Sequence, residues 1–211
     1  MLLDVLFEAQ VAPHCEPVII NTPFITPERE VRVAVPTVNS LLGDKLTAFA
    51  PRTIGVLYDP KRKIDIAKQL FDVGVLFDAA TDLSVAAEAY AASHARQLVY
   101  RQARFSLADT LNDSIEAGFL YCQLELRGGA KTEQGLFLQD GVTALQNHLV
   151  NQPFRRDEAR IAAAKVACVA AWIQRRPVGV KGGYDLRRVA ILLRPLRCEV
   201  CTDRPGLHET R

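Results

Sequence analysis

The N-terminal part of the chain alternates apolar and polar positions in the way that β-strands require. Strands are predicted over residues 2–8, 15–20 and 31–35. The first is apolar on both faces, whereas the last has its three valines, Val31, Val33 and Val35, on one face and ends at Pro36. Three extended segments cannot close a sheet with two covered faces, so the pattern predicts a fragment of a β-sheet.

From Thr37, a good N-cap residue, the apolar positions repeat at helical spacing. We expect helices over residues 38–50, 61–78, 82–103, 107–127, 133–150 and 157–175. The predicted fold class is therefore α+β. We expect the chain to divide into three regions, with residual strands at 1–36, a mostly α-helical bundle at 37–176 and an irregular tail at 177–211.

Composition narrows the class of protein. The 26 basic and 24 acidic residues give a net charge of only +2, so no global field attracts nucleic acid or membranes. The five cysteines are odd in number and scattered, which is typical of reduced thiols. We find no signal-peptide pattern and no apolar stretch long enough to cross a bilayer, so we expect a cytoplasmic protein without a membrane partner.

Two charged residues lie where apolar ones are expected. Asp4 falls within the apolar strand 2–8, where a carboxylate needs a metal, a cation or several hydrogen-bond donors, unless it lies at a solvated chain end. Lys45 falls within the predicted apolar stripe of the helix 38–50, which is made of Val38, Leu41, Leu42 and Phe49. The opposite face is predicted to hold Asn39, Ser40, Gly43 and Thr47. Lys45 would either meet an anion or extend to solvent along its stem. A nucleotide phosphate and a buried carboxylate are both suitable anions.

The following helix carries a polar face that includes Lys68, Gln69 and Asp72, opposite an apolar face around Leu70 and Phe77. Lys68 and Asp72 are four positions apart and can form an ion pair. An exposed pair of this kind contributes little, so spacing alone also fits a solvated surface.

The order of these segments resembles that of the AbiEii/AbiGii toxin family of nucleotidyltransferases. The segments are Leu-Leu-Asp-Val-Leu-Phe-Glu at 2–8, Val-Arg-Val-Ala-Val-Pro at 31–36, Leu-Leu-Gly-Asp-Lys-Leu-Thr-Ala at 41–48 and Lys-Gln-Leu-Phe-Asp at 68–72. In that family a strand supplies a metal-facing acid, an "(A/G)-x-K-L-x-A" helix supplies a lysine, and an "(R/K)-D-L-(Y/F)-D" helix supplies an aspartate. Usable motifs cover residues 1–80, and a looser helical likeness extends to 175.

The resemblance implies a function and a set of site residues. Asp4 would be the metal-binding strand acid, Lys45 and Lys68 would bind the nucleotide, and Asp72 would complete the catalytic set with Asp4 and Lys45. The activity would be transfer of a nucleotidyl group from a nucleoside triphosphate, with Mg²⁺, to an RNA or protein acceptor. The protein would be the toxin of a bacterial toxin–antitoxin or phage-defence system, with an antitoxin protein as partner.

The sequence departs from the family pattern at two places. The family's glycine-rich turn and paired Asp-x-Asp belong upstream of Asp4, and this sequence begins at that strand, so we expect a truncated or split nucleotidyltransferase. Position 69 is Gln where the family usually has an acid. Nucleotidyl transfer uses two metals held by several carboxylates, which one Asp cannot replace. The alternative is an inactive helical binding module that pairs with an antitoxin or a complementing chain.

Overall fold

The computed structural model describes residues 12–24, 27–124, 126–150 and 153–175. Within these residues the chain forms a β-hairpin followed by a helical body, which confirms the α+β class. The strand predicted at 2–8, with Asp4, and the tail predicted at 177–211 lie outside the described residues. No described helix is long and apolar enough to cross a membrane.

The elements follow one another along the chain as the periodicity predicts. They are β1 (Cys15–Ile19), β2 (Arg32–Pro36), α1 (Val38–Ala48), η1 (Pro60–Arg62), α2 (Lys63–Ala79), α3 (Leu83–Arg101), α4 (Leu107–Gln123), α5 (Glu133–Leu145), η2 (Gln146–His148) and α6 (Arg156–Arg175). The helix predicted over 133–150 is shorter and ends in the 3₁₀ turn η2. Tightening of a last turn in this way is common at helix C-termini.

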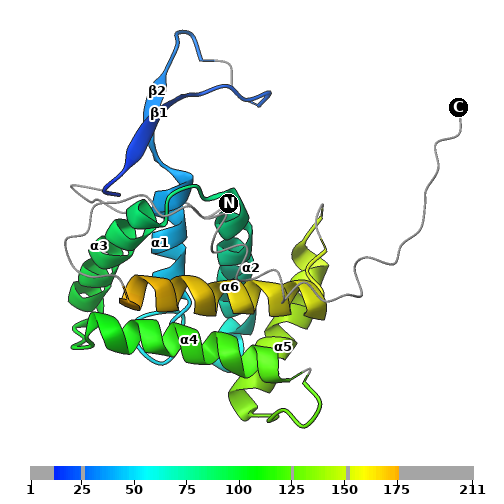
Figure 1. Ribbon diagram of the computed structural model, residues 1–211. Helices are drawn as coiled ribbons and strands as arrows, with labels where there is room; N and C mark the ends of the chain where they lie inside the picture. The colour runs from blue at the N-terminus through cyan, green and yellow to red at the C-terminus, as the bar shows by residue number, and fades with distance from the viewer. Residues whose placement is uncertain (1–11, 25–26, 125, 151–152, 176–211) are drawn as a thin grey trace, which may run out of the picture.

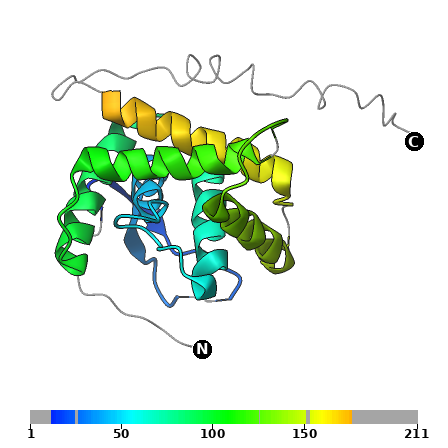
Figure 2. The same ribbon diagram turned by 90° about the horizontal axis from the view of Figure 1, so that it is seen from below.

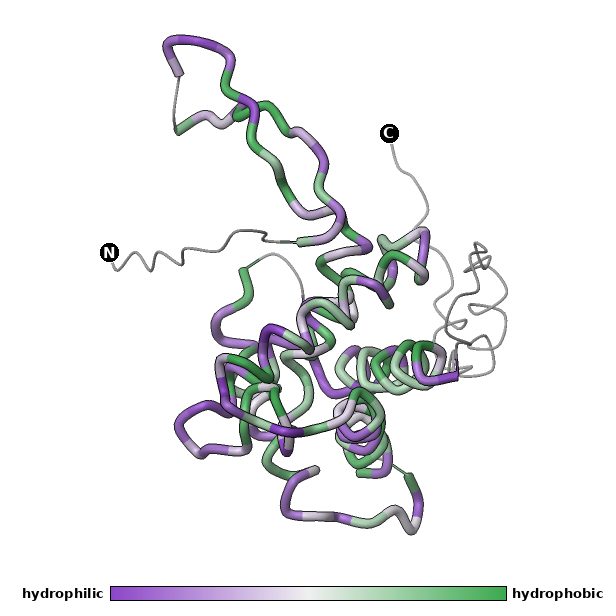
Figure 3. The backbone as a smooth tube through the Cα atoms, turned by 90° about the vertical axis from the view of Figure 1, so that its left-hand side faces the viewer, coloured by the Kyte–Doolittle hydropathy of each residue, from purple (hydrophilic) through white to green (hydrophobic). Residues whose placement is uncertain are grey.

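The two strands form an antiparallel hairpin that projects from the helical body (Figures 1 and 3). Cys15 lies opposite Pro36, and Val18 lies opposite Val33. The chain then enters α1 directly, because Thr37 is its N-cap and the Thr37 side chain accepts a hydrogen bond from the Ser40 N–H at 3.2 Å. The N-cap predicted from the sequence is thereby confirmed.

In the helical body α1 packs against both α2 and α3, and α2 also packs against α5 and α6. Helices α4 and α6 lie side by side across the bundle (Figures 1 and 2). One continuous hydrophobic core joins these helices, and its largest fully buried side chains include Leu42, Leu70 and Leu111. The positions of α1 and α2 relative to each other are therefore set by the core rather than by a surface contact.

The close approach of α1 to α3 depends on Gly43. A Cβ atom at this position would lie 2.7 Å from the backbone nitrogen of Tyr90 and would collide with the carbonyl oxygen of Ala86. The absence of a side chain at Gly43 allows the two helices to meet at their backbones. This contact sets the orientation of α1, and with it the direction of the side chains around Lys45.

Candidate functional site

An ion pair between α1 and α2 joins the two motif residues Lys45 and Asp72. Lys45 Nζ lies 3.1 Å from Asp72 Oδ2, with side-chain exposures of 32% and 22% respectively. Both groups are thus partly shielded yet still reachable from solvent. An ammonium group has three N–H donors, so one bond to Asp72 leaves two for another ligand.

The structure corrects the predicted orientation of α1. Leu42 and Phe49 are buried as expected, but Val38 is 38% exposed and Lys45 lies at the border of the buried face rather than in its middle. The face that holds Ser40, Gly43 and Thr47, predicted to be opposite the apolar stripe, is buried. The reason is the close contact with α3, which needs small side chains on the covered face.

The ion pair that the spacing allows between Lys68 and Asp72 on α2 is not the one that forms. Asp72 pairs with Lys45, and Lys68 is exposed and forms no ion pair with any residue that the structure describes. The Gln69 side-chain oxygen is buried and has no hydrogen-bond partner within the described ranges. A buried amide oxygen without a partner, one turn from Asp72, is a polar feature that the sequence pattern did not reveal.

The described residues do not supply a metal site. Across residues 12–24, 27–124, 126–150 and 153–175, no group of three or more His, Cys, Asp or Glu side chains could hold a metal ion. Magnesium requires oxygen ligands, usually one or two carboxylates together with substrate phosphates. The only carboxylate beside Lys45 in an ion pair, Asp72, is already engaged by that lysine. These residues alone therefore do not fit the Mg²⁺ that nucleotidyl transfer requires.

A second polar cluster lies between α1 and α3. Ser93 Oγ donates a hydrogen bond to Asp44 Oδ1 at 2.7 Å, and Arg96 donates to Ser93 Oγ at 2.8 Å. These residues line a cleft of about 450 Å³ together with Ser40, whose buried hydroxyl has no partner among the described residues. The sequence pattern does not predict this cluster, because its members are far apart in the chain and each has an ordinary helical position.

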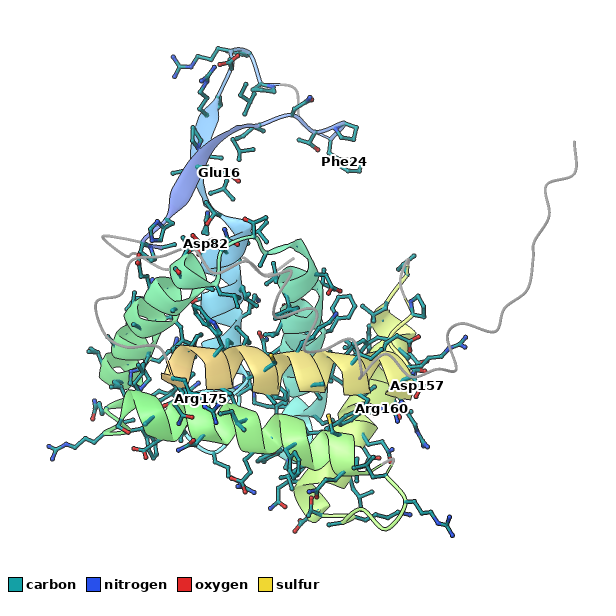
Figure 4. The ribbon with its side chains drawn as sticks, viewed as in Figure 1. Glu16, Phe24, Asp82, Asp157, Arg160 and Arg175 are labelled. Carbon is teal, nitrogen blue, oxygen red and sulfur yellow. The ribbon has the colours of Figure 1, made fainter. Side chains whose placement is uncertain are left out.

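Arg156 and Arg175, which each belong to a pair of adjacent arginines in the sequence, do not form one surface on α6. Arg156 begins this helix and Arg175 ends it. Figure 4 shows Asp157 and Arg175 at the two ends of the same helix. A helix of 20 residues is roughly 30 Å long, so the two ends cannot contact the same phosphate group.

Comparison with known protein families shows which family the chain belongs to. The model of the family described as "Nucleotidyl transferase AbiEii toxin, Type IV TA system" matches residues 1–164. The chain belongs to the AbiEii family. The matched region contains Lys45, Lys68 and Asp72 as well as the whole hairpin. No curated protein and no solved structure matches the chain.

Membership of the AbiEii family sets the general activity. The family consists of nucleotidyltransferase toxins of type IV toxin–antitoxin systems, which implies an antitoxin partner. Nucleotidyltransferases of this kind generally use a nucleoside triphosphate and a divalent metal. The geometry adds that the lysine of one helical motif and the last aspartate of the other meet at one place.

Proposed function

We propose that this chain carries the nucleotide-holding half of an AbiEii-type nucleotidyltransferase toxin, with Lys45 at its centre. Lys45 would bind an oxygen of the triphosphate, Asp72 would orient the ammonium, and Lys68 would add positive charge near the same helix. The nucleotidyl group would pass from the nucleoside triphosphate to a hydroxyl group of an RNA or protein acceptor, with release of pyrophosphate.

The observation that carries the proposal is the 3.1 Å ion pair between Lys45 and Asp72. An isolated lysine extends into water, whereas this one is held in one direction by a carboxylate on another helix. The remaining N–H donors of Lys45 are therefore pre-oriented, which lowers the entropic cost of binding a phosphate. Catalysis of phosphoryl-group transfer depends mainly on such positioning and on charge neutralisation.

Metal chemistry in this proposal would need residues beyond the described ones. Asp4, which lies in the matched region, would be one metal ligand. The chain contains no Asp-x-Asp, so a second set of carboxylates would have to come from another chain or segment. What the described residues contribute to the reaction is limited to holding and orienting the phosphates.

The direct test is isothermal titration of the whole chain with the magnesium complexes of ATP, GTP, CTP and UTP. We expect at least one nucleotide to bind, and we expect K45A to weaken that binding about tenfold or more, because a charge-assisted hydrogen bond is lost. K68A should weaken it less. No binding at millimolar nucleotide would contradict the proposal.

A second ion pair on the same helix supplies a matched control. Lys165 Nζ lies 2.6 Å from Asp78 Oδ2, which joins α6 to α2 away from Lys45. K165A therefore removes a lysine from an ion pair on α2 without touching the proposed site. Equal losses of nucleotide affinity in K165A and K45A would show that binding depends only on the overall positive charge of the protein. That result would reject the assigned role of Lys45.

The alternative is an inactive binding module that pairs with an antitoxin or a complementing chain. The observation in its favour is the lack of a metal-holding cluster among the residues that the structure describes. Incubation of the chain with radiolabelled nucleotides, Mg²⁺, total RNA and protein acceptors separates the two. Label on either acceptor that depends on Lys45 supports the transferase, and nucleotide-independent partner binding without label supports the module.

A further inference from the structure

Among the residues that the structure describes, no strand pairs with the outer edge of β2. The Ile20 N–H donates to the Val31 carbonyl at 2.9 Å, so residues 31, 33 and 35 turn their backbone groups toward β1. In an antiparallel ladder the intervening residues point the other way. The N–H and C=O groups of Arg32 and Ala34 therefore face outward, and within the described residues β2 pairs only with β1.

The other edge of the hairpin is blocked. Along β1 the outward positions are Cys15, Pro17 and Ile19. Pro17 has no N–H to donate, and it lies in the middle of this edge, where proline prevents the addition of a strand. On β2 the only proline is Pro36, at the end of the strand. In the described part of the chain, the hairpin thus has one edge closed by proline and one open edge without a partner strand.

One face of the hairpin is also mostly apolar, and its two central valines are exposed. Val33 lies opposite Val18, and both are exposed at 39% and 41% respectively. The same face also carries Val31, Val35, Ile20 and Glu16, because alternate residues of a strand point to one side and Glu16 lies opposite Val35. Figure 4 shows the hairpin, marked by Glu16 and Phe24, standing clear of the helical body.

We propose that two copies of this chain associate through β2, in antiparallel register about a two-fold axis at Val33. In this register Arg32 exchanges both backbone hydrogen bonds with Ala34 of the partner subunit, and Ala34 does the same with Arg32 of the partner subunit. The two hairpins become one four-stranded sheet. The helical bodies lie at opposite ends of this sheet, since each α1 follows its β2 directly.

The strand is complementary to itself in this register. Val33 meets Val33 of the partner subunit, and Val31 meets Val35 of the partner subunit, so the apolar face becomes continuous. On the other face Arg32 lies opposite the small side chain of Ala34 of the partner subunit. Arg32 also keeps its own counter-ion, because Arg32 Nε lies 2.7 Å from Glu30 Oε1. Direct like-charge pairs, which oppose strand pairing, do not arise.

The closed edge explains why association should stop at two copies. After pairing through β2, both outer edges of the four-stranded sheet are β1 strands with Pro17 at their centre. A third copy finds no continuous row of donors and acceptors. The interface is isologous, as in most two-fold dimers. It is also small, so the dimer should form in the micromolar to millimolar range rather than at nanomolar concentration.

Sedimentation equilibrium of the full chain over that concentration range provides the first test. The wild type should move from 23.3 kDa toward twice this mass. A34P removes an outward N–H from β2 and should remain monomeric. I19P removes an outward N–H from the closed edge of β1 and should dimerise like the wild type. Both prolines leave the hydrogen bonds within the hairpin intact, and circular dichroism checks the helical body of each variant.

Disulfide formation tests the register itself. At a two-fold axis through position 33 the two Cα atoms form a non-hydrogen-bonded pair about 4.5 Å apart, within reach of a disulfide. V33C should therefore give a covalent dimer on mild oxidation. V35C places its thiols roughly 13 Å apart along the strands and should not exceed the wild-type background. The native cysteines are common to both variants.

Three results would overturn the proposal. A wild-type chain that stays monomeric at millimolar concentration would show that the β2 edge does not accept a second copy, as when another segment of the same chain covers it. Equal dimerisation of A34P and the wild type, or equal loss in A34P and I19P, would place any interface elsewhere. Equal cross-linking of V33C and V35C would reject the two-fold register.

Discussion

Lys45 on α1 and Asp72 on α2 meet in an ion pair of 3.1 Å, although the two residues belong to separate motifs of the sequence. Their side chains are 32% and 22% exposed, so solvent screens the attraction. The pair is better explained as a device that orients a lysine than as a source of stability. This distinction leads to the first prediction.

Removing either partner should change stability only slightly. We expect K45Q and D72N each to lower the free energy of unfolding by about 1 kcal/mol or less, with a coupling energy of about 0.5 kcal/mol in the double-mutant cycle. Urea unfolding of the two single variants and the double variant measures these values. A loss several times larger would mean that the pair supports the fold, and nucleotide-binding losses in these variants would then need a different interpretation.

Gly43 should not tolerate any side chain. G43A introduces a Cβ atom that meets the backbone of Ala86 and lies 2.7 Å from Tyr90 N, so α1 and α3 must separate. We expect a destabilisation of about 1–3 kcal/mol, typical of overpacking. The direction of the stability change tests the contact, because Gly to Ala in an unobstructed helix would stabilise by about 1 kcal/mol. Thermal unfolding of G43A that matches or exceeds the wild type would contradict the observed contact.

Asp113 should anchor the loop that follows α1. Its carboxylate is 5% exposed and accepts hydrogen bonds from the Arg52 N–H at 2.8 Å and the Thr53 hydroxyl at 2.9 Å. D113A leaves these donors without their acceptor and should cost about 1–3 kcal/mol. D113N keeps one acceptor oxygen and should cost less. Chemical denaturation measures both.

His94 should make the stability of the fold depend on pH. Burial lowers the pKa of His94 below its ordinary value of 6.5, opposed by a hydrogen bond to the backbone of Ser106. Its ring nitrogen Nε2 is buried and has no partner in the described part of the chain. Because the folded-state pKa is the lower one, the contribution to stability is present above the unfolded pKa and is lost as pH falls through the folded pKa.

The measurement compares urea midpoints between about pH 8 and about pH 5, the interval in which histidine titrates. The wild type should lose stability toward the acid end, and H94Q should show a smaller slope because it cannot bind the proton. H148Q replaces an exposed histidine of η2 and should keep the wild-type slope. Identical slopes in the wild type and H94Q would remove His94 as the cause.

Much of the fold follows from local sequence. Thr37 predicts the start of α1 because its hydroxyl can bond a free N–H of the first turn, and Ser106 begins the helix predicted at 107 through a capping box with Asp109. The helical periods locate each of the six α-helices in the described residues to within five residues at each end. Such features depend on neighbours within one turn, so the sequence contains them directly.

The local sequence pattern did not predict which face of α1 is buried. Val38 and Lys45 belong to a pattern that predicts a buried stripe, but Val38 is exposed. Ser40, Gly43 and Thr47 are buried, with Gly43 directly against α3. A hydropathy pattern favours large apolar side chains, whereas a close helix crossing requires small ones. The partner of Asp72 was ambiguous for a similar reason, since Lys68 is near in sequence and Lys45 is near only after α1 and α2 pack.

From the sequence alone, the chain is determined to be an α+β protein with helices at known positions and with the ordered motifs of its family. Only the tertiary structure decides that Lys45 and Asp72 meet, that Asp44 joins Ser93 and Arg96, and that β2 pairs with β1 alone among the described strands. The physical reason is that periodicity and caps act over a few residues, whereas these contacts join segments whose separation is set by the packing of the whole core.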